Sequence, residues 1–66
     1  MKVKIKTKEQ LFEDGWALNR DGVYANGDCV HLVEAMDEYF GKEIEIDEGS
    51  HCEAGWFWPE ESYEQL

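Results

Sequence analysis

The chain has 66 residues, 42% of them hydrophobic, with three Trp, three Tyr, three Phe and a formal net charge of −10. This length supplies one small core and excludes a second domain, so residues 1–66 are predicted to form a single domain, and the aromatic content argues against disorder. No stretch approaches the roughly 20 apolar residues that cross a bilayer, and the acidic balance disfavours direct binding of nucleic acid or anionic membranes.

The N-terminal segment alternates lysine with apolar residues. Val3 and Ile5 fall on one face of residues 2–6, which predicts a half-buried strand. Residues 1–8 hold four lysines and no acid, a charge of +4. Residues 9–66 hold all 16 acids against two basic residues, a charge of −14. The sequence therefore predicts one basic strand on an otherwise anionic domain.

A helix start signal follows this strand. Thr7 and Gln10 have the spacing of a capping box, in which each side chain accepts a hydrogen bond from the other residue's backbone N–H. Gly15 suits the left-handed position just after a helix. A short helix is predicted over residues 8–14, with Leu11 facing the core.

Turn signals divide the next segment. Asp21–Gly22 and Asn26–Gly27 are pairs favoured at tight turns with positive φ. Residues 23–25 between them are long enough for one short strand. Residues 16–31 are therefore predicted to form two or three brief strands joined by turns.

The middle of the chain changes period twice. Apolar residues at helical spacing predict a second short helix over residues 33–40, which Gly41 ends. Residues 42–47 return to strict alternation, and this places Ile44 and Ile46 inward with the acids outward. This is the clearest strand pattern in the sequence.

The C-terminal third carries an aromatic cluster. Residues 54–58 are predicted to form a strand on which Trp56 and Trp58 share a face and Phe57 points the other way. Pro59 cannot donate to a strand ladder and ends it. Burial in the core is the favoured interpretation of the two tryptophans, while an exposed recognition patch is the functional alternative.

A single 3₁₀ turn over residues 60–62 and a last strand over residues 63–66 complete the prediction. The fold class is thus mainly β with short helices. Five or so short strands in a chain of this size favour a small SH3-like barrel or roll.

Three segments resemble a group of short bacteriophage and prophage proteins of uncharacterised activity. They are residues 4–11 (KIKTKEQL), 36–44 (MDEYFGKEI) and 55–60 (GWFWPE), and together the likeness covers most of the chain. The chain departs from that group at residues 29–31 and 51–52. The resemblance implies a phage origin and a small β-barrel, and it brings no activity or catalytic residues.

Two thiols and two imidazoles match the complement of a tetrahedral zinc site. They belong to Cys29, His31, His51 and Cys52. Zinc pairs are usually separated by two to five residues, whereas adjacent His51 and Cys52 on an extended chain point to opposite faces. Free thiols and surface histidines are therefore favoured over a metal site or a disulfide, and no cofactor is expected.

The same residues argue against catalysis. Cys29 and His31 would share a strand face roughly 6–7 Å apart, which is too far for direct proton transfer. Acidic surroundings raise the pKa of a thiol, and no oxyanion donor is evident. The chain is not expected to be an enzyme.

The leading hypothesis is a phage accessory protein of the host cytoplasm that binds and modulates a host protein. A nucleic-acid-binding factor is one candidate partner, since carboxylates can occupy its basic groove. The alternatives are a small zinc-stabilised structural domain and an oligomeric virion or assembly component. The ordinary interpretation of the acidic residues is that they keep the protein soluble without binding a partner. The residues expected to contact the partner are Glu43, Glu45, Asp47, Glu48, Trp56 and Trp58.

Overall fold

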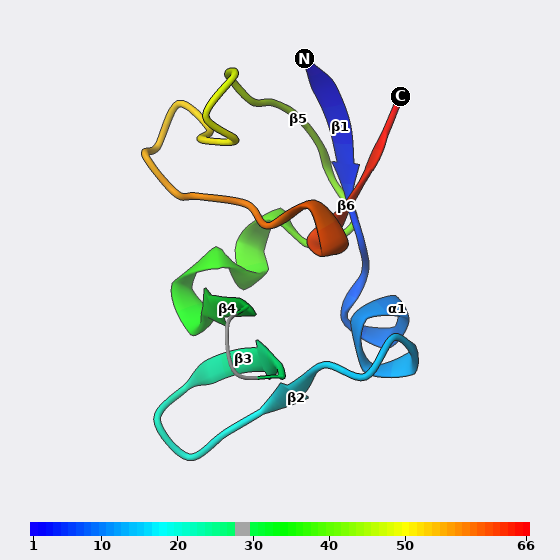
Figure 1. Cartoon of the computed structure of the whole chain (residues 1–66), viewed down its shortest axis with the longest axis vertical. Helices are drawn as coiled ribbons and strands as arrows, with labels where there is room; N and C mark the ends of the chain where they lie inside the picture. The colour runs from blue at the N-terminus through cyan, green and yellow to red at the C-terminus, as the bar shows by residue number, and fades with distance from the viewer. Residues whose placement is uncertain (28–29) are drawn as a thin grey trace.

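The computed structural model describes residues 1–27 and 30–66 and shows a mainly β chain with short helices. Its six strands form two three-stranded antiparallel sheets, one toward each end of the longest axis (Figure 1). One continuous core joins them. No helix in the described part of the chain is long and apolar enough to cross a membrane.

The first sheet has the N-terminal strand at its centre. Strand β1 (Lys2–Ile5) lies between β5 (Glu43–Glu45) and β6 (Tyr63–Gln65). Val3 and Ile5 are fully buried. The period-two prediction for β1 is therefore confirmed, and the last predicted strand is confirmed as β6.

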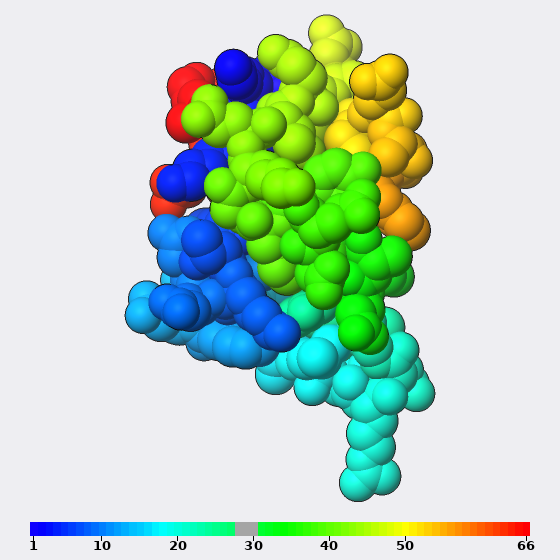
Figure 2. All heavy atoms as spheres, turned by 180° about the vertical axis from the view of Figure 1, so that it is seen from behind, coloured from blue at the N-terminus to red at the C-terminus, as the bar shows by residue number. Residues whose placement is uncertain are grey.

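The second sheet is a meander of strands β2 (Ala17–Leu18), β3 (Val23–Asn26) and β4 (Val30–Val33). Tyr24 lies opposite Leu32, and both belong to the core. The β2–β3 turn projects from the body of the molecule, as the cyan spheres in Figure 2 show. Three brief strands in this region agree with the sequence prediction.

Helix α1 (Lys8–Glu13) begins with the predicted capping box. The Gln10 backbone N–H donates to Thr7 Oγ1 at 3.2 Å, and the Thr7 N–H donates to Gln10 Oε1 at 2.9 Å. Leu11 is fully buried, and Gly15 follows the helix with a φ of 101°. The local signals thus place both ends of α1.

The second predicted helix is a 3₁₀ helix, η1 (Glu34–Tyr39), on which Met36 is buried. One end is held by the β2–β3 turn and the other by strand β1. The Glu34 N–H donates to the Gly22 carbonyl, and the N–H of Gly41, just beyond the helix, donates to the Ile5 carbonyl. No side chain caps its start, and the segment adopts a tighter connecting turn than the apolar spacing predicts.

The predicted strand over residues 54–58 is wrong. Within it only Phe57 makes a bridge, an isolated one with His51. The Gly55 N–H closes a turn by donating to the Cys52 carbonyl, and Gly55 has a φ of 90°. The chain therefore folds back at the position where the alternation of aromatic residues indicated an extended strand.

The predicted barrel is not closed over the residues that the structure describes. The 3₁₀ helix η2 (Glu60–Ser62) follows Pro59 as predicted, but no strand over residues 54–58 joins the two sheets. In residues 1–27 and 30–66 the sheets are separate and do not form a closed barrel.

Candidate protein-interaction surface

The basic strand does not form a separate positive patch, because acids flank it. Across sheet β5–β1–β6, Lys4 lies opposite Glu43 on one side and Glu64 on the other, and Lys2 lies opposite Glu45. Lys2 Nζ is 3.8 Å from Glu43, and the α-amino group of Met1 is 3.1 Å from Glu45. The positive charge of residues 1–8 is thus partly neutralised by acids of β5 and β6 that lie beside it in the folded chain.

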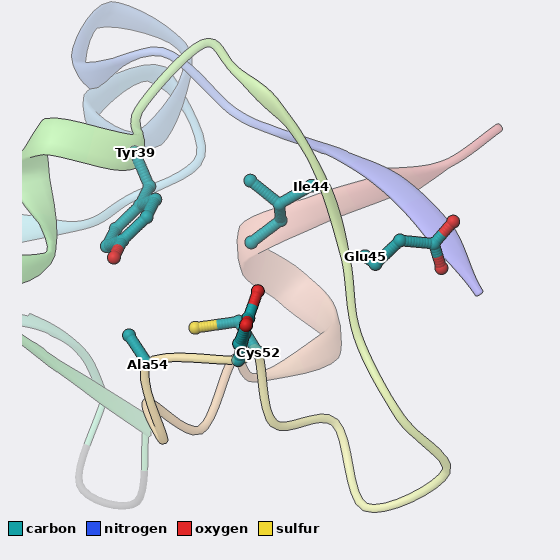
Figure 3. A pocket seen from close by; sticks show the side chains of 6 residues that line it. Tyr39, Ile44, Glu45, Cys52 and Ala54 are labelled. Atoms are coloured by element: carbon teal, nitrogen blue, oxygen red, sulfur yellow. The ribbon is translucent and has the colours of Figure 1, made fainter.

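A hollow of about 540 Å³ opens beside the outer edge of β5, and we call it the main hollow. Tyr39 comes from the end of η1, Ile44 from β5, and the other wall is the turn after residue 51. In Figure 3 the sulfur of Cys52 points toward the space between Tyr39 and Ala54. The lining residues are Tyr39, Ile44, Glu45, Cys52, Glu53 and Ala54.

The acids at the main hollow are not equivalent. The Glu45 carboxylate points away from it in Figure 3, toward the α-amino group with which it pairs. Glu53 lines the hollow, and Glu38 lies beside the Tyr39 hydroxyl. Among the described residues Glu38, Glu48 and Glu53 make no ion pair and are exposed. These carboxylates remain available to a cationic partner.

A smaller hollow of about 290 Å³ adjoins the main one, sharing Glu45, Cys52 and Glu53 with it. Asp47 shapes its wall. The Asp47 Oδ1 accepts hydrogen bonds from Gly49 N–H at 2.8 Å and His51 N–H at 3.0 Å. The His51 N–H above all holds the pKa of Asp47 below its ordinary value, against a smaller opposing effect of desolvation.

Asp47→Ala is expected to loosen this turn and lower the melting temperature by roughly a few degrees, because two backbone donors lose their acceptor. The difference from wild type should be complete above pH 4 and vanish as pH falls through the lowered folded-state pKa of Asp47. Thermal denaturation from pH 2 to pH 7 measures this. Glu48→Ala, in the same turn, is the control and should have little effect.

Four groups surround the Cys52 sulfur. Burial opposes ionisation of the thiol most strongly, yet the Trp58 indole and the backbone N–H groups of Trp56, Ala54 and Cys52 outweigh it. The pKa of Cys52 therefore lies below its ordinary value. Burial, then Glu38 and Cys52, raise the pKa of the nearby Tyr39.

The three neighbouring aromatic residues differ in exposure. Trp58 is 0% exposed and belongs to the core, which agrees with the favoured interpretation of the tryptophans and leaves no Trp58 surface for the predicted partner contact. Trp56 is half-buried against the core. Phe57 is 53% exposed and its ring stacks edge-on against His51, with centroids 5.5 Å apart. Phe57 is therefore the exposed aromatic beside the smaller hollow.

The residues considered for zinc do not converge within the described part of the chain. Cys52 is a free, buried thiol, whereas its neighbour His51 is exposed. His31 lies on β4 in the other sheet. Cys29 lies outside the described residues. In residues 1–27 and 30–66 no three His, Cys, Asp or Glu side chains are placed to hold a metal ion.

Of the six predicted contact residues, the structure brings two to the hollows. Glu45 lines both, and Asp47 lines the smaller one. Glu48 is exposed on the adjoining turn, while Glu43 faces Lys2. Sequence reasoning missed Tyr39, Glu53 and Ala54, for which no local pattern gives a signal. It also missed Phe57 as a contact residue, although the alternation of residues 56–58 places Phe57 on the face opposite the two tryptophans.

Comparison with known proteins found no matching family model, no matching curated protein and no matching solved structure.

Proposed function

We propose that the chain is a small phage-type accessory protein of the host cytoplasm that binds and modulates a host protein without catalysis. The main hollow supports this proposal best. Its apolar wall of Tyr39, Ile44 and Ala54 is bordered by the carboxylates of Glu38 and Glu53. An apolar floor with an acidic border suits the aliphatic stem and charged head of lysine or arginine.

The partner is proposed to present a basic surface, such as the groove of a nucleic-acid-binding protein. Glu48 extends the acidic border along the turn after β5, and Phe57 adds an exposed aromatic anchor against His51 of the smaller hollow. Aromatic anchors contribute disproportionately to binding, while peripheral charges steer encounter. DNA or RNA should therefore compete with this protein for its partner.

An SH3-like roll is part of the proposal. Two features support it: a meander of three short strands forms one sheet, and β1 pairs with strands from the second half of the chain in the other. The sheets contribute to one core, which is the arrangement of a roll built from two small sheets.

Charge reversal at the border tests the function. Host proteins are captured on the immobilised chain and identified, and binding of the purified partner is then followed by surface plasmon resonance. Glu48→Lys with Glu53→Lys should slow association about tenfold at low salt, because peripheral charges act mainly on encounter. Added DNA should displace the partner.

The matched control carries the same change of net charge on helix α1. Glu9→Lys with Glu13→Lys, both exposed, should alter association less than twofold. Reversal of Glu43 and Glu45 is avoided, because new lysines there would face Lys2 and the α-amino group across the sheet. Equal effects of the two double variants, or binding insensitive to salt, would show that the hollow is not the contact surface.

A further inference from the structure

The Cys52 side chain has an unusual environment for a buried cysteine. The residue is 9% exposed, but its sulfur lines the main hollow and points toward its open space (Figure 3). Tyr39 and Ala54 stand on either side of it. A small molecule in the hollow would therefore contact the sulfur without any rearrangement of the core.

The indole N–H of Trp58 is a buried hydrogen-bond donor that acts on the Cys52 sulfur. Trp58 is 0% exposed, and within the described residues its indole Nε1 has no partner at full hydrogen-bond geometry. The indole N–H of Trp58 favours the ionised form of the Cys52 thiol. A buried N–H without an acceptor is unfavourable, and a thiolate is a far better acceptor than a thiol. The core is therefore better satisfied when the sulfur is negative.

Charged groups at the hollow set which reagents reach the sulfur. The carboxylate of Glu38 approaches from η1 and that of Glu53 from the turn that carries Cys52. The Glu45 carboxylate points away, toward the α-amino group, and His51 immediately precedes Cys52. The pKa of Cys52 is nevertheless lowered, because the surrounding N–H groups and the indole outweigh the effect of burial. The carboxylates of Glu38 and Glu53 attract cations and repel anions at the mouth of the hollow.

We infer that Cys52 is a modification site for small cationic disulfides, which enter the main hollow and form a mixed disulfide with its sulfur. The Cys52 thiolate attacks one sulfur of the reagent. A new S–S bond forms, the S–S bond of the reagent breaks, and the electron pair leaves on the second sulfur, which takes a proton from water. Cys52 is oxidised and the reagent is reduced. This inference goes beyond partner binding and does not depend on it.

The test compares reagents of similar size and opposite charge. In a Cys29→Ser background, intact mass spectrometry follows mixed-disulfide formation with cystamine, a dication, and with 3,3′-dithiodipropionate, a dianion. At pH 7 and low salt cystamine should react at least about tenfold faster, and the ratio should fall toward that of the urea-unfolded chain as salt rises. Bis(2-hydroxyethyl) disulfide, which is neutral, should react at an intermediate rate.

Two variants separate the effect of the Trp58 indole on the reactivity of the thiol from the effect of Glu53 on the preference for cationic reagents. Trp58→Phe keeps a ring but removes the indole N–H, so it should slow all three reagents several-fold at pH 7 and shift the pH–rate profile upward. Circular dichroism verifies that this variant folds. Glu53→Gln should reduce the preference for cystamine and leave the rate of the neutral reagent nearly unchanged.

Three results would overturn the inference: folded Cys52 reacting more slowly than in urea with all three reagents, equal rates for dication and dianion at low salt, or an unchanged profile in folded Trp58→Phe. Because none of these measurements involves a host protein, failure here leaves the proposed function standing, and failure of the charge-reversal experiment leaves this site standing.

Discussion

Trp58→Ala is expected to leave little folded protein, whereas Phe57→Ala should cost less than about 1 kcal/mol. Trp58 is 0% exposed and stacks edge-on against Tyr39, with ring centroids 5.7 Å apart. Replacing a buried tryptophan by alanine costs about 3–5 kcal/mol. A domain of this length is stable by roughly 3–10 kcal/mol, so one such cavity removes much of the total.

Urea denaturation followed by far-ultraviolet circular dichroism measures both variants, since tryptophan fluorescence changes with the substitution itself. Phe57 is the matched control because it is the adjacent aromatic and is 53% exposed. Similar losses of unfolding free energy in the two variants would contradict the assignment of Trp58 to the core and Phe57 to the surface.

Ile46→Asp is expected to destabilise the chain by several kcal/mol, more than Ile44→Asp. Ile46 is 3% exposed, just beyond β5, and a carboxylate there would be buried without a partner between Glu45 and Asp47. Ile44 is half-buried at the edge of the main hollow, where a carboxylate keeps contact with water. Urea midpoints rank the two variants, and a larger loss for Ile44→Asp would contradict this burial order.

Elements defined by neighbouring residues could be predicted from the sequence. The capping box of Thr7 and Gln10 needs only residues three positions apart, and the alternation in β1 directly identifies Val3 and Ile5 as buried. Pro59 likewise indicates where η2 begins. These signals are local, and tertiary contacts do not override them.

Elements decided by distant contacts could not be predicted. The turn at Gly55 is closed locally with Cys52, but the Trp58 N–H, eight residues along the chain, returns to the Ser50 carbonyl. The alternation of Trp56, Phe57 and Trp58 gives no sign of this return. The segment of η1 is held by hydrogen bonds to the Gly22 and Ile5 carbonyls, which lie 12 and 36 residues from their donors Glu34 and Gly41. The main hollow joins Tyr39, Ile44 and Ala54 from three parts of the chain, so its residues share no sequence pattern.

The two sheets differ in how far apart in the sequence their partners lie. Tyr24 on β3 pairs with Leu18 and Leu32, both nearby, whereas Val3 on β1 pairs with Ile44 and Gln65. Closing long loops carries a larger entropic cost before any contact is gained. The meander can therefore form early, while the β5–β1–β6 sheet must wait for almost the whole chain. Since β5 and the turn at Ala54 provide walls of the main hollow, the interaction surface depends on these long-range contacts and not on the meander alone.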